Sequence, residues 1–406
     1  MFQTKAYVSK SKGEPFIESL IPRREIGIND VLIQVIFVGI NSYDLKNYNN
    51  EKSLFPMTPG MEVTGIVQQV GANVKKFRIG SLVGVGKIID SCRQCDMCYN
   101  DQEQYCKTRP TFIYNDRNKY NHSNEEGFPT FGGLSQLLVV DEKYVVGIYS
   151  NANLNLAKIT PLFHSGLVAY SPMKKFKLKP GNKFGVIGIS SIGHIAVKLG
   201  VALGAYVTVF SNDESKKSSC LYELKADSFI LESDLDSFKE ELNTFDFILD
   251  TRMIPDKIEK NIDFLKIDGT LSVINIDQDK LNNLQENNLS NRVINKSATG
   301  STKDIQELIN LCSQFKIDCN VELMYAHQIN QAFDSLQIDE TSYSIVIDVT
   351  SIESYGKEKE DIYDAIEKSI DKMSKELQEE EQSSNKVINL ESYLDSDDSE
   401  IESDSD

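Results

Sequence analysis

Apolar and polar positions divide the chain into two kinds of sequence. The first 150 residues hold short β-branched runs bounded by Gly, Pro and Asn, such as 31–40 and 64–70, and predict a β-rich fold. From about Lys183, apolar runs of strand length alternate with segments of helical pattern. The expected strands are 183–189, 205–210, 227–231, 245–250 and 270–276, and the expected helices are 192–203, 215–226, 235–243 and 258–266. Such alternation predicts βαβ crossovers, and hence a parallel sheet with helices on both faces.

The end of the chain has a different pattern. A helical segment at 302–315 and an apolar run at 343–349, the last expected strand, precede a highly charged region. From Gly356 to about Gln382, a few apolar residues recur at helical spacing and predict a solvated amphipathic helix. The last residues, 395–406, cannot bury enough apolar surface to fold. We interpret 351–406 as an acidic amphipathic helix followed by a disordered tail, and both a solubilising and a partner-binding role stay open.

The negative charge of the chain is concentrated in this tail. The 406 residues carry a formal charge of -18, of which residues 351–406, with 19 acidic and 6 basic side chains, contribute -13. This balance argues against nucleic acid and anionic membranes as partners. No apolar run is long enough to span a bilayer, and the N-terminal residues lack the apolar core of a signal peptide, so we expect a cytoplasmic protein.

Four of the seven cysteines lie close together in the sequence. Cys92, Cys95, Cys98 and Cys106 place four thiols in one short segment, whereas the other three are dispersed. Four thiolates close a tetrahedral shell around Zn²⁺ and leave no open position, which is typical of a structural site. We therefore predict a structural zinc lobe at 92–106. An iron–sulfur cluster and four unrelated free thiols are the alternatives.

A glycine-containing turn joins the first expected parallel strand to its helix. Gly188, Ser190, Ser191 and Gly193 fall where a dinucleotide fold places its phosphate turn, with the pyrophosphate on the helix N-terminus. The middle glycine of the usual pattern is replaced by Ser190, whose Cβ could weaken binding or whose hydroxyl could contact a phosphate. We predict a bound dinucleotide, with an empty, vestigial site as the alternative.

The end of the next strand indicates which dinucleotide binds. An NAD site usually has an acidic residue there, which accepts a hydrogen bond from the ribose 2′-hydroxyl. Here the strand ends in Ser211, and Lys216 follows shortly after, a combination that suits a 2′-phosphate. We therefore favour NADP(H). Asp213 and Glu214 argue for NAD, because either could repel that phosphate.

Three further segments carry a resemblance to a known family, and they read PGMEVTGIVQQVG, GGLSQLLVVDEKYVV and VIGISSIGHIAVKLGVALGAYVTVFS. Together with the cysteine lobe and the glycine turn, they make residues 1–350 resemble the medium-chain dehydrogenase/reductases, the superfamily of zinc-type alcohol dehydrogenases. Within it the chain is most similar to the NADP-dependent cinnamyl alcohol dehydrogenase group.

The resemblance implies an α/β architecture of two domains. A GroES-like catalytic domain at 1–164, to which 300–350 returns, would flank a Rossmann NADP-binding domain at 165–299. It also implies a homodimer, and it places Gly300 and Ser301 near the nicotinamide.

Departures from the family pattern affect the reacting centre. Asn41, Met61 and His164 stand where the family holds its catalytic zinc with a Cys, a His and a Cys, although Asp44 and Glu62 are retained. Amide and thioether groups are poor Zn²⁺ ligands. We therefore predict no catalytic zinc. The segment around Asn41 resembles instead the GxNxxD segment of zinc-free quinone and enone reductases of the same superfamily.

These residues lead to two principal functional hypotheses. The first is an NADP(H)-dependent oxidoreductase that acts on a small aldehyde, quinone or enone, with Tyr43 as proton donor, Asn41 orienting the carbonyl oxygen, and Glu62 and His164 completing the candidate catalytic set. Tyr43 as a packed aromatic and His164 as a hydrogen-bonded cleft residue are the structural alternatives. The second is a catalytically inactive, NADP(H)-sensing scaffold whose tail binds a protein partner. A zinc-dependent cinnamyl-type dehydrogenase is the third possibility.

Overall fold

The computed structural model describes residues 1–118, 127–149, 155–234, 239–255, 258–286, 291–297, 299–338 and 343–352. The predicted acidic helix from Gly356 and the tail beyond it lie outside these described residues, as does part of the helix expected at 235–243. Within the described ranges, no helix combines the length and the apolar content that crossing a bilayer requires.

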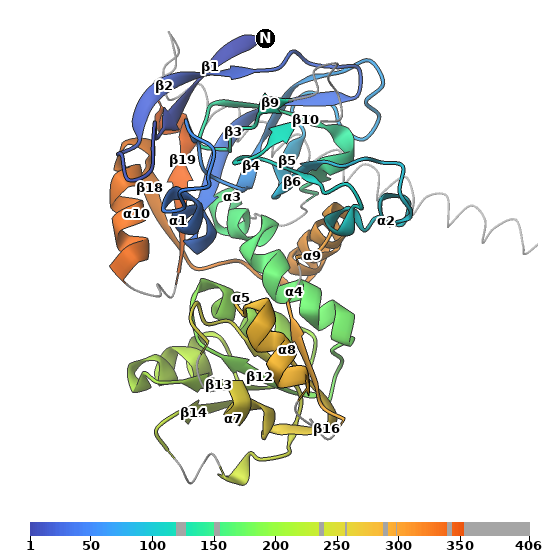
Figure 1. Ribbon diagram of the computed structural model, residues 1–406, viewed down its shortest axis with the longest axis vertical. Helices are drawn as coiled ribbons and strands as arrows, with labels where there is room; N and C mark the ends of the chain where they lie inside the picture. Colours follow the sequence, from blue (N-terminus) through green and yellow to red (C-terminus); the bar gives the residue numbers. More distant parts are fainter. Residues whose placement is uncertain are drawn as a thin grey trace, which may run out of the picture.

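A β-rich part forms the upper half of Figure 1. Its main sheet has seven strands in the order β11-β5-β4-β3-β19-β18, with β10 also paired to β3. These strands are β3 (Asp30–Ile40), β4 (Glu62–Val70), β5 (Leu82–Val85), β10 (Leu137–Asp141), β11 (Val145–Gly147), β18 (Val321–Tyr325) and β19 (Ser344–Asp348). Shorter pairs flank it: β1 (Phe2–Val8) with β2 (Ile17–Arg23), β6 (Ile88–Asp90) with β7 (Thr111–Phe112), and β8 (Arg117–Asn118) with β9 (Phe128–Pro129).

The last described strand returns to this first sheet. β19 pairs antiparallel with β3, so that Val346 lies opposite Gly39. Figure 1 shows the resulting arrangement, with the orange strands β18 and β19 beside the blue strand β3. The last described strand therefore completes a sheet that begins with β3 near the start of the chain.

A parallel sheet forms the lower half of Figure 1. Its six strands follow the order β14-β13-β12-β15-β16-β17, and every neighbouring pair is parallel. They are β12 (Lys183–Ile187), β13 (Tyr206–Ser211), β14 (Ser228–Leu231), β15 (Phe245–Asp250), β16 (Leu265–Val273) and β17 (Val293–Lys296). The predicted fold class, a GroES-like β-rich part with a Rossmann sheet, is confirmed; the predicted domain boundaries stay predictions.

Helices cover both faces of the parallel sheet because its strands are apolar on both sides. In β15, Phe247 packs into the core with α4 and α5, whereas Phe245 and Ile248 pack into the core with α7 and α8. The α-helices of the described residues are α1 (Ser42–Tyr48), α2 (Asp96–Tyr99), α3 (Leu156–Ile159), α4 (Ser165–Phe176), α5 (Ser191–Ala202), α7 (Ile258–Ile262), α8 (Gln278–Glu286), α9 (Thr302–Phe315) and α10 (Ile329–Ile338).

Two expected helices differ from the structure. The helix expected at 258–266 ends at Ile262, because Leu265 already belongs to β16 and pairs with Phe245 of β15. In the segment expected as helix 215–226, a short 3-10 turn is followed by a π-helical turn at Ser219–Glu223. Strand pairing thus overrides the local helical pattern in the first case.

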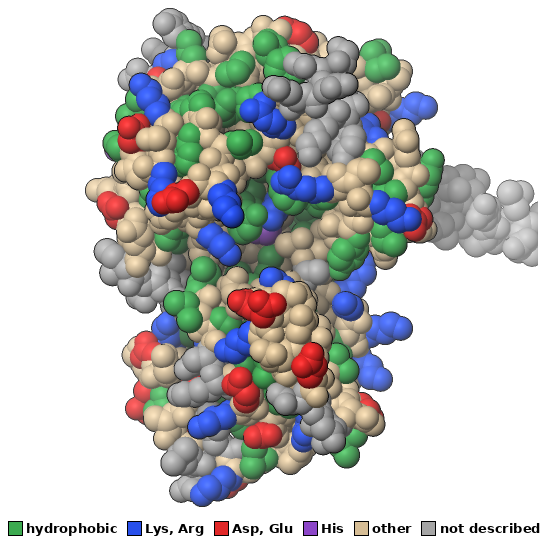
Figure 2. All heavy atoms as spheres, in the orientation of Figure 1, with side chains coloured by type: hydrophobic (Ala, Val, Ile, Leu, Met, Phe, Trp, Pro, Cys, Tyr) green, Lys and Arg blue, Asp and Glu red, His purple; other side chains and the backbone are tan. Residues whose placement is uncertain are grey.

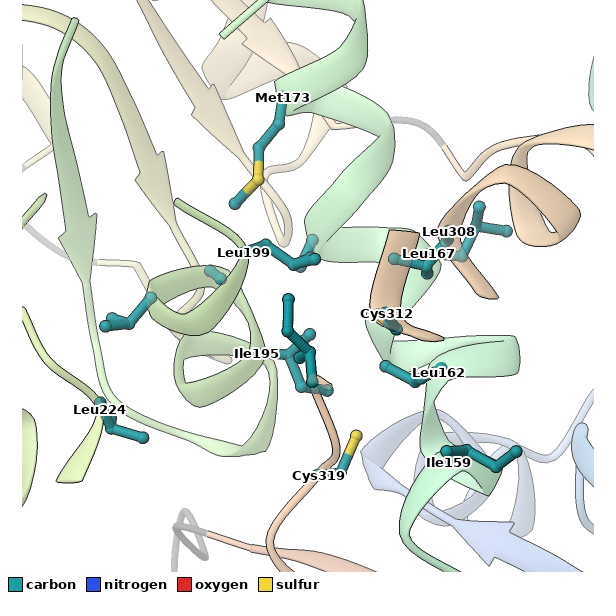
Figure 3. Packing of buried hydrophobic residues seen from close by; sticks show 14 of the residues in the cluster. Ile159, Leu162, Leu167, Met173, Ile195, Leu199, Leu224, Leu308, Cys312 and Cys319 are labelled. Carbon is teal, nitrogen blue, oxygen red and sulfur yellow. The ribbon is translucent and has the colours of Figure 1, made fainter. Parts of the chain in front are cut away.

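One apolar cluster joins the two halves of the molecule. It brings Leu167 of α4, Ile195 of α5 and Leu308 of α9 into a shared core, together with Ile159 of α3. Figure 3 shows these side chains among the helices that contribute to the cluster. This packing fixes the position of α4, whose first residue belongs to the candidate site described next.

Candidate active site

A cavity of about 730 Å³ lies at the carboxyl ends of the parallel strands. Dinucleotides bind at this edge of doubly wound sheets. The turn after β12 and the start of α5 form one wall, and the end of β3 with the start of α1 forms another. Six predicted site residues line it: Asn41, Gly188, Ser190, Ser191, Ser211 and Lys216. Figure 2 shows the surface hollowed where the upper and lower halves meet, with Lys and Arg side chains beside the hollow.

The turn from Gly188 to Gly193 has the geometry that the glycine spacing predicts. Gly188 adopts a φ of +83°, in the left-handed region that favours glycine. A Cβ on Gly193 would lie 2.3 Å from the carbonyl oxygen of Gly188, so only glycine lets α5 begin this close to the strand. Ser190 is the N-cap residue of α5, but its side chain makes no capping hydrogen bond. Its hydroxyl and the first backbone N–H groups of α5 therefore suit a pyrophosphate.

The segment after β13 fits a 2′-phosphate. Lys216 and Asn212 line the cavity, whereas Asp213 does not. Asp213 Oδ1 instead accepts a hydrogen bond from the backbone N–H of Ser215 at 2.9 Å, and the hydrogen bonds from Ser215 lower the pKa of the Asp213 carboxyl. The buried Ser211 hydroxyl accepts from the backbone N–H of Asp213 at 3.1 Å. Of the two acidic residues that argued for NAD, Asp213 is thus engaged within its own turn, and neither Asp213 nor Glu214 lines the cavity.

Gly300 and Ser301 do not line this cavity. Ser301 is the N-cap residue of α9, and it exchanges capping hydrogen bonds with Asp304. A Cβ on Gly300 would lie 2.7 Å from Asp304 Oδ2. The structure therefore shows a helix-starting role for both residues, and their proximity to a nicotinamide stays a prediction.

The start of α1 is held by a reciprocal capping box. Asn41 Oδ1 accepts from the backbone N–H of Tyr43 at 2.9 Å, and Asp44 Oδ2 accepts from the backbone N–H of Asn41 at 3.0 Å. The other oxygen of Asp44 accepts from the backbone N–H of Gly60 at 2.9 Å, which ties α1 to the loop before β4. The Nδ2 atom of Asn41 is buried and makes no hydrogen bond of normal geometry among the described residues, although the Asn41 side chain is close enough to lower the pKa of the Glu62 carboxyl.

Glu62 connects β4 to the start of α4. Its Oε1 atom accepts from the backbone N–H of Ser165 at 2.8 Å and from the Ser165 hydroxyl at 2.6 Å. Burial raises the pKa of the Glu62 carboxyl to about 8, and burial likewise raises the pKa of Asp44 to about 6. Because ionisation is unfavourable in this dry environment, Glu62 is mostly neutral at pH 7.

The side chains at the family's catalytic zinc positions do not fit a metal. Met61 is 1% exposed and offers only a thioether, and Asn41 offers an amide. His164 is buried, its Nδ1 atom has no partner among the described residues, and burial together with the positive charge of Lys87 lowers its pKa to about 3. Across the part of the chain that the structure describes, the only cluster of three or more metal-ligating His, Cys, Asp or Glu side chains is the cysteine lobe.

Tyr43 lines a second, smaller cavity of about 80 Å³. Met61, Phe112 and Lys87 also line it. The Lys87 Nζ atom lies 4.0 Å from the centre of the Tyr43 ring and 4.4 Å from that of Phe112. The Tyr43 ring also contacts His164 edge-on, with ring centres 5.9 Å apart. The structure thus brings Tyr43 and His164 together. The alternatives, Tyr43 as a packed aromatic and His164 as a hydrogen-bonded cleft residue, stay open.

The four cysteines of the lobe converge as predicted. Their sulfur atoms all lie within 4.8 Å of one another, and those of Cys92 and Cys98 are 3.9 Å apart. Zn–S bonds of about 2.3 Å in a tetrahedron place sulfurs about 3.8 Å apart, so the cage fits Zn²⁺. The lobe is tied to the rest of the molecule through the buried Glu103, whose Oε1 atom accepts from the backbone N–H of Thr302 at 2.7 Å.

Sequence analysis missed the residues that follow β15. Thr251 donates from its hydroxyl to the carbonyl oxygens of Ile187 and Gly188, and so holds the glycine turn. Arg252 lines the large cavity and pairs with the fully buried Asp250 at 2.6 Å. The available signal was their place at the carboxyl end of a parallel strand.

Family comparisons agree with this architecture. Residues 27–150 match the alcohol dehydrogenase GroES-like domain, and residues 191–314 match the zinc-binding dehydrogenase family. A probable mannitol dehydrogenase of Medicago sativa is 35% identical over 333 residues, which cover 81% of this chain and 90% of that protein. The probable cinnamyl alcohol dehydrogenase 7/8 of Picea abies is 36% identical over 332 residues, covering 81% of this chain and 90% of that protein.

A solved structure supports the same comparison. The crystal structure of CAD from Helicobacter pylori complexed with NADP(H) superposes with a TM-score of 0.78 at 31% identity. The superposition covers 87% of this chain and 99% of that chain.

Proposed function

Because the chain belongs to the alcohol dehydrogenase family that joins a GroES-like domain to a zinc-binding dehydrogenase domain, we propose that it is an NADP(H)-dependent oxidoreductase that reduces an aldehyde, quinone or enone without a catalytic zinc. One observation carries this proposal. Asn41 lines the same cavity as the glycine turn; its Nδ2 atom is buried and makes no hydrogen bond of normal geometry among the described residues, although the Asn41 side chain is close enough to lower the pKa of the Glu62 carboxyl. The Asn41 amide thus lies at the edge of the cavity in which we propose that a cofactor and a substrate meet.

The cavity also favours NADP(H) as the cofactor. The first N–H groups of α5 suit the pyrophosphate, and the ammonium of Lys216 suits the 2′-phosphate. Asp213, which would repel that phosphate, is engaged with Ser215. The crystal structure of the Helicobacter pylori relative with NADP(H) supports the same choice.

The chemistry of a carbonyl reduction can be assigned to residues of this chain. NADPH, when bound, would supply a hydride to the carbonyl carbon. Asn41 orients the carbonyl oxygen through its amide N–H, and Tyr43 donates the proton that converts this oxygen to a hydroxyl. Glu62, being mostly neutral, keeps α4 in place through Ser165 without adding negative charge beside the developing alkoxide.

The test is NADPH oxidation, followed by absorbance, with a panel of aldehydes, quinones and enones. We expect Tyr43→Phe to lower kcat by about 10²-fold and to leave the KM for NADPH unchanged, because only proton transfer is removed. Tyr222→Phe is the matched control, since Tyr222 is 71% exposed and lines neither cavity. An unchanged kcat for Tyr43→Phe would remove Tyr43 from the mechanism.

The cysteine lobe would hold one structural Zn²⁺, with Cys92, Cys95, Cys98 and Cys106 as its four ligands. Elemental analysis should therefore find one zinc per chain. Two per chain would contradict the zinc-free reacting centre and favour a zinc-dependent alcohol dehydrogenase. A homodimer and a partner for the tail stay predictions.

The replaced ligand positions also favour a second candidate, a catalytically inactive scaffold that senses NADP(H). Met61 and Asn41 are poor ligands for the zinc ion with which the family polarises its substrate. Binding of NADPH without turnover of any carbonyl in the panel would favour this scaffold over the enzyme.

A further inference from the structure

The second cavity has an unbalanced positive charge. Lys87 and Arg109 line it, and none of the described residues that line it is Asp or Glu. Arg109 is paired with Asp116 at 3.3 Å and stacks on Phe112, so its charge is compensated. Lys87 forms no ion pair with a described residue and is half-buried between the Tyr43 and Phe112 rings. The excess charge in the cavity therefore belongs to Lys87.

The two aromatic rings beside Lys87 leave its positive charge uncompensated in the cavity. Two aromatic faces attract the ammonium but leave its three N–H donors without an anionic acceptor. The carboxyl of Asp44 does not line the cavity; it accepts from two backbone N–H groups and interacts with the hydroxyl of Tyr114, which does line the cavity. Lys87 also contributes to the low pKa of His164, so its field extends to the neighbouring site. An anion that enters the cavity would therefore meet a half-buried ammonium that forms no ion pair with a described residue.

The two cavities are arranged around the first turn of α1. Asn41 lines the large cavity and Tyr43 lines the small one. A carbonyl group held by Asn41 and Tyr43 would therefore lie at this turn, and the rest of the substrate would extend toward Lys87. The volume of about 80 Å³ compares with about 30 Å³ per water in the liquid, which is enough for a carboxylate on a short chain.

We propose that the small cavity binds the anionic end of the substrate through Lys87, and that the substrate is a short carbonyl compound that carries a carboxylate. This inference rests on the proposed function, in which the hydride of NADPH goes to the carbonyl carbon and a proton to its oxygen. Lys87 takes no part in these transfers; it selects the substrate by charge.

The first experiment compares 4-oxobutanoate with its neutral methyl ester as substrates for NADPH oxidation. The wild-type protein should prefer the acid. Lys87→Met should lower kcat/KM for the acid by about 10- to 100-fold more than kcat/KM for the ester, the loss expected for one charge-assisted contact. Lys87→Arg should retain most of the preference. Lys260→Met, on the exposed surface of α7, is the charge-matched control and should change neither rate.

A binding measurement separates the failure of this inference from the failure of the proposed function. Succinate, which cannot be reduced, should raise the Tm of the wild type and of Lys87→Arg but not of Lys87→Met, and the neutral succinamide should raise none. Equal rates on acid and ester, with no effect of succinate on the Tm, would overturn the anionic site even in an active enzyme. A Tm increase that requires Lys87, without turnover of any carbonyl, would support the anion site and overturn the oxidoreductase proposal.

Discussion

The buried carboxyl of Glu62 makes the stability of the protein depend on pH in a predictable direction. Its pKa is about 8 in the folded protein against an ordinary 4.5. A raised carboxyl pKa means that the folded state binds the proton more tightly than the unfolded state does. The wild type should therefore lose stability as the pH rises from 4.5 to about 8 and lose no more from this group above that range. Glu62→Gln replaces the carboxyl by a permanently neutral group that can still accept from Ser165.

The two pKa values of Glu62 also give the size of the expected difference in the free energy of unfolding between Glu62→Gln and the wild type. Each pH unit between them corresponds to about 1.4 kcal/mol, so the interval from 4.5 to about 8 sets an upper limit of about 5 kcal/mol. At pH 5 the variant and the wild type should have nearly equal free energies of unfolding. At pH 8.5 the variant should be more stable by a few kcal/mol.

The assay is urea unfolding of both proteins at several pH values between 5 and 9. The buried Asp44 titrates in both proteins, but its charge raises the pKa of Glu62, so its contribution cancels only in part. Glu322→Gln on exposed β18 is the control that should track the wild type at every pH. A variant that is less stable than the wild type at pH 8.5 would show that Glu62 is ionised and paired with a cation, which would refute a neutral, metal-free centre.

Three further predictions concern the cofactor turn and the lobe. Gly193→Ala should weaken NADPH binding at least tenfold in a fluorescence titration, because the new Cβ would lie 2.3 Å from the Gly188 carbonyl oxygen and displace the start of α5; an unchanged Kd would contradict this packing. Lys216→Met should weaken NADPH about tenfold and leave NADH unchanged, since one charged contact to the 2′-phosphate is lost, and equal weakening of both would argue against that contact. Cys106→Ser should reduce the zinc content from one per chain to none and lower the Tm, whereas Cys220→Ser, outside the lobe, should retain the metal.

The features that sequence alone predicts are those determined by local spacing. The glycine turn spans six residues between a strand and a helix, and the four cysteines lie within one loop, so their geometry depends little on distant parts of the chain. The alternation of strands and helices likewise determines the parallel sheet.

The features that sequence missed depend on contacts between distant segments. Lys87 belongs to no recognisable sequence motif. Its surroundings form only when the fold brings Tyr43 of α1 and Phe112 of β7 next to it. Leu265 belongs to a helical pattern in the sequence but joins β16 because Phe245 offers a partner in the sheet. Arg252 is defined by its pairing with the buried Asp250, which periodicity does not reveal.

Through the hydrogen bond between Glu103 and Thr302, the zinc that we propose for the cysteine lobe would affect more than its own loop. Thr302 starts α9, and α9 packs in the apolar cluster shared with α4 and α5. A chain that folded without zinc would therefore weaken this contact to α9, and α9 belongs to the apolar cluster that joins the upper and lower halves of the molecule. If the lobe binds zinc as we propose, the metal would help to set the alignment of the two halves around the large cavity without contacting the residues that line it.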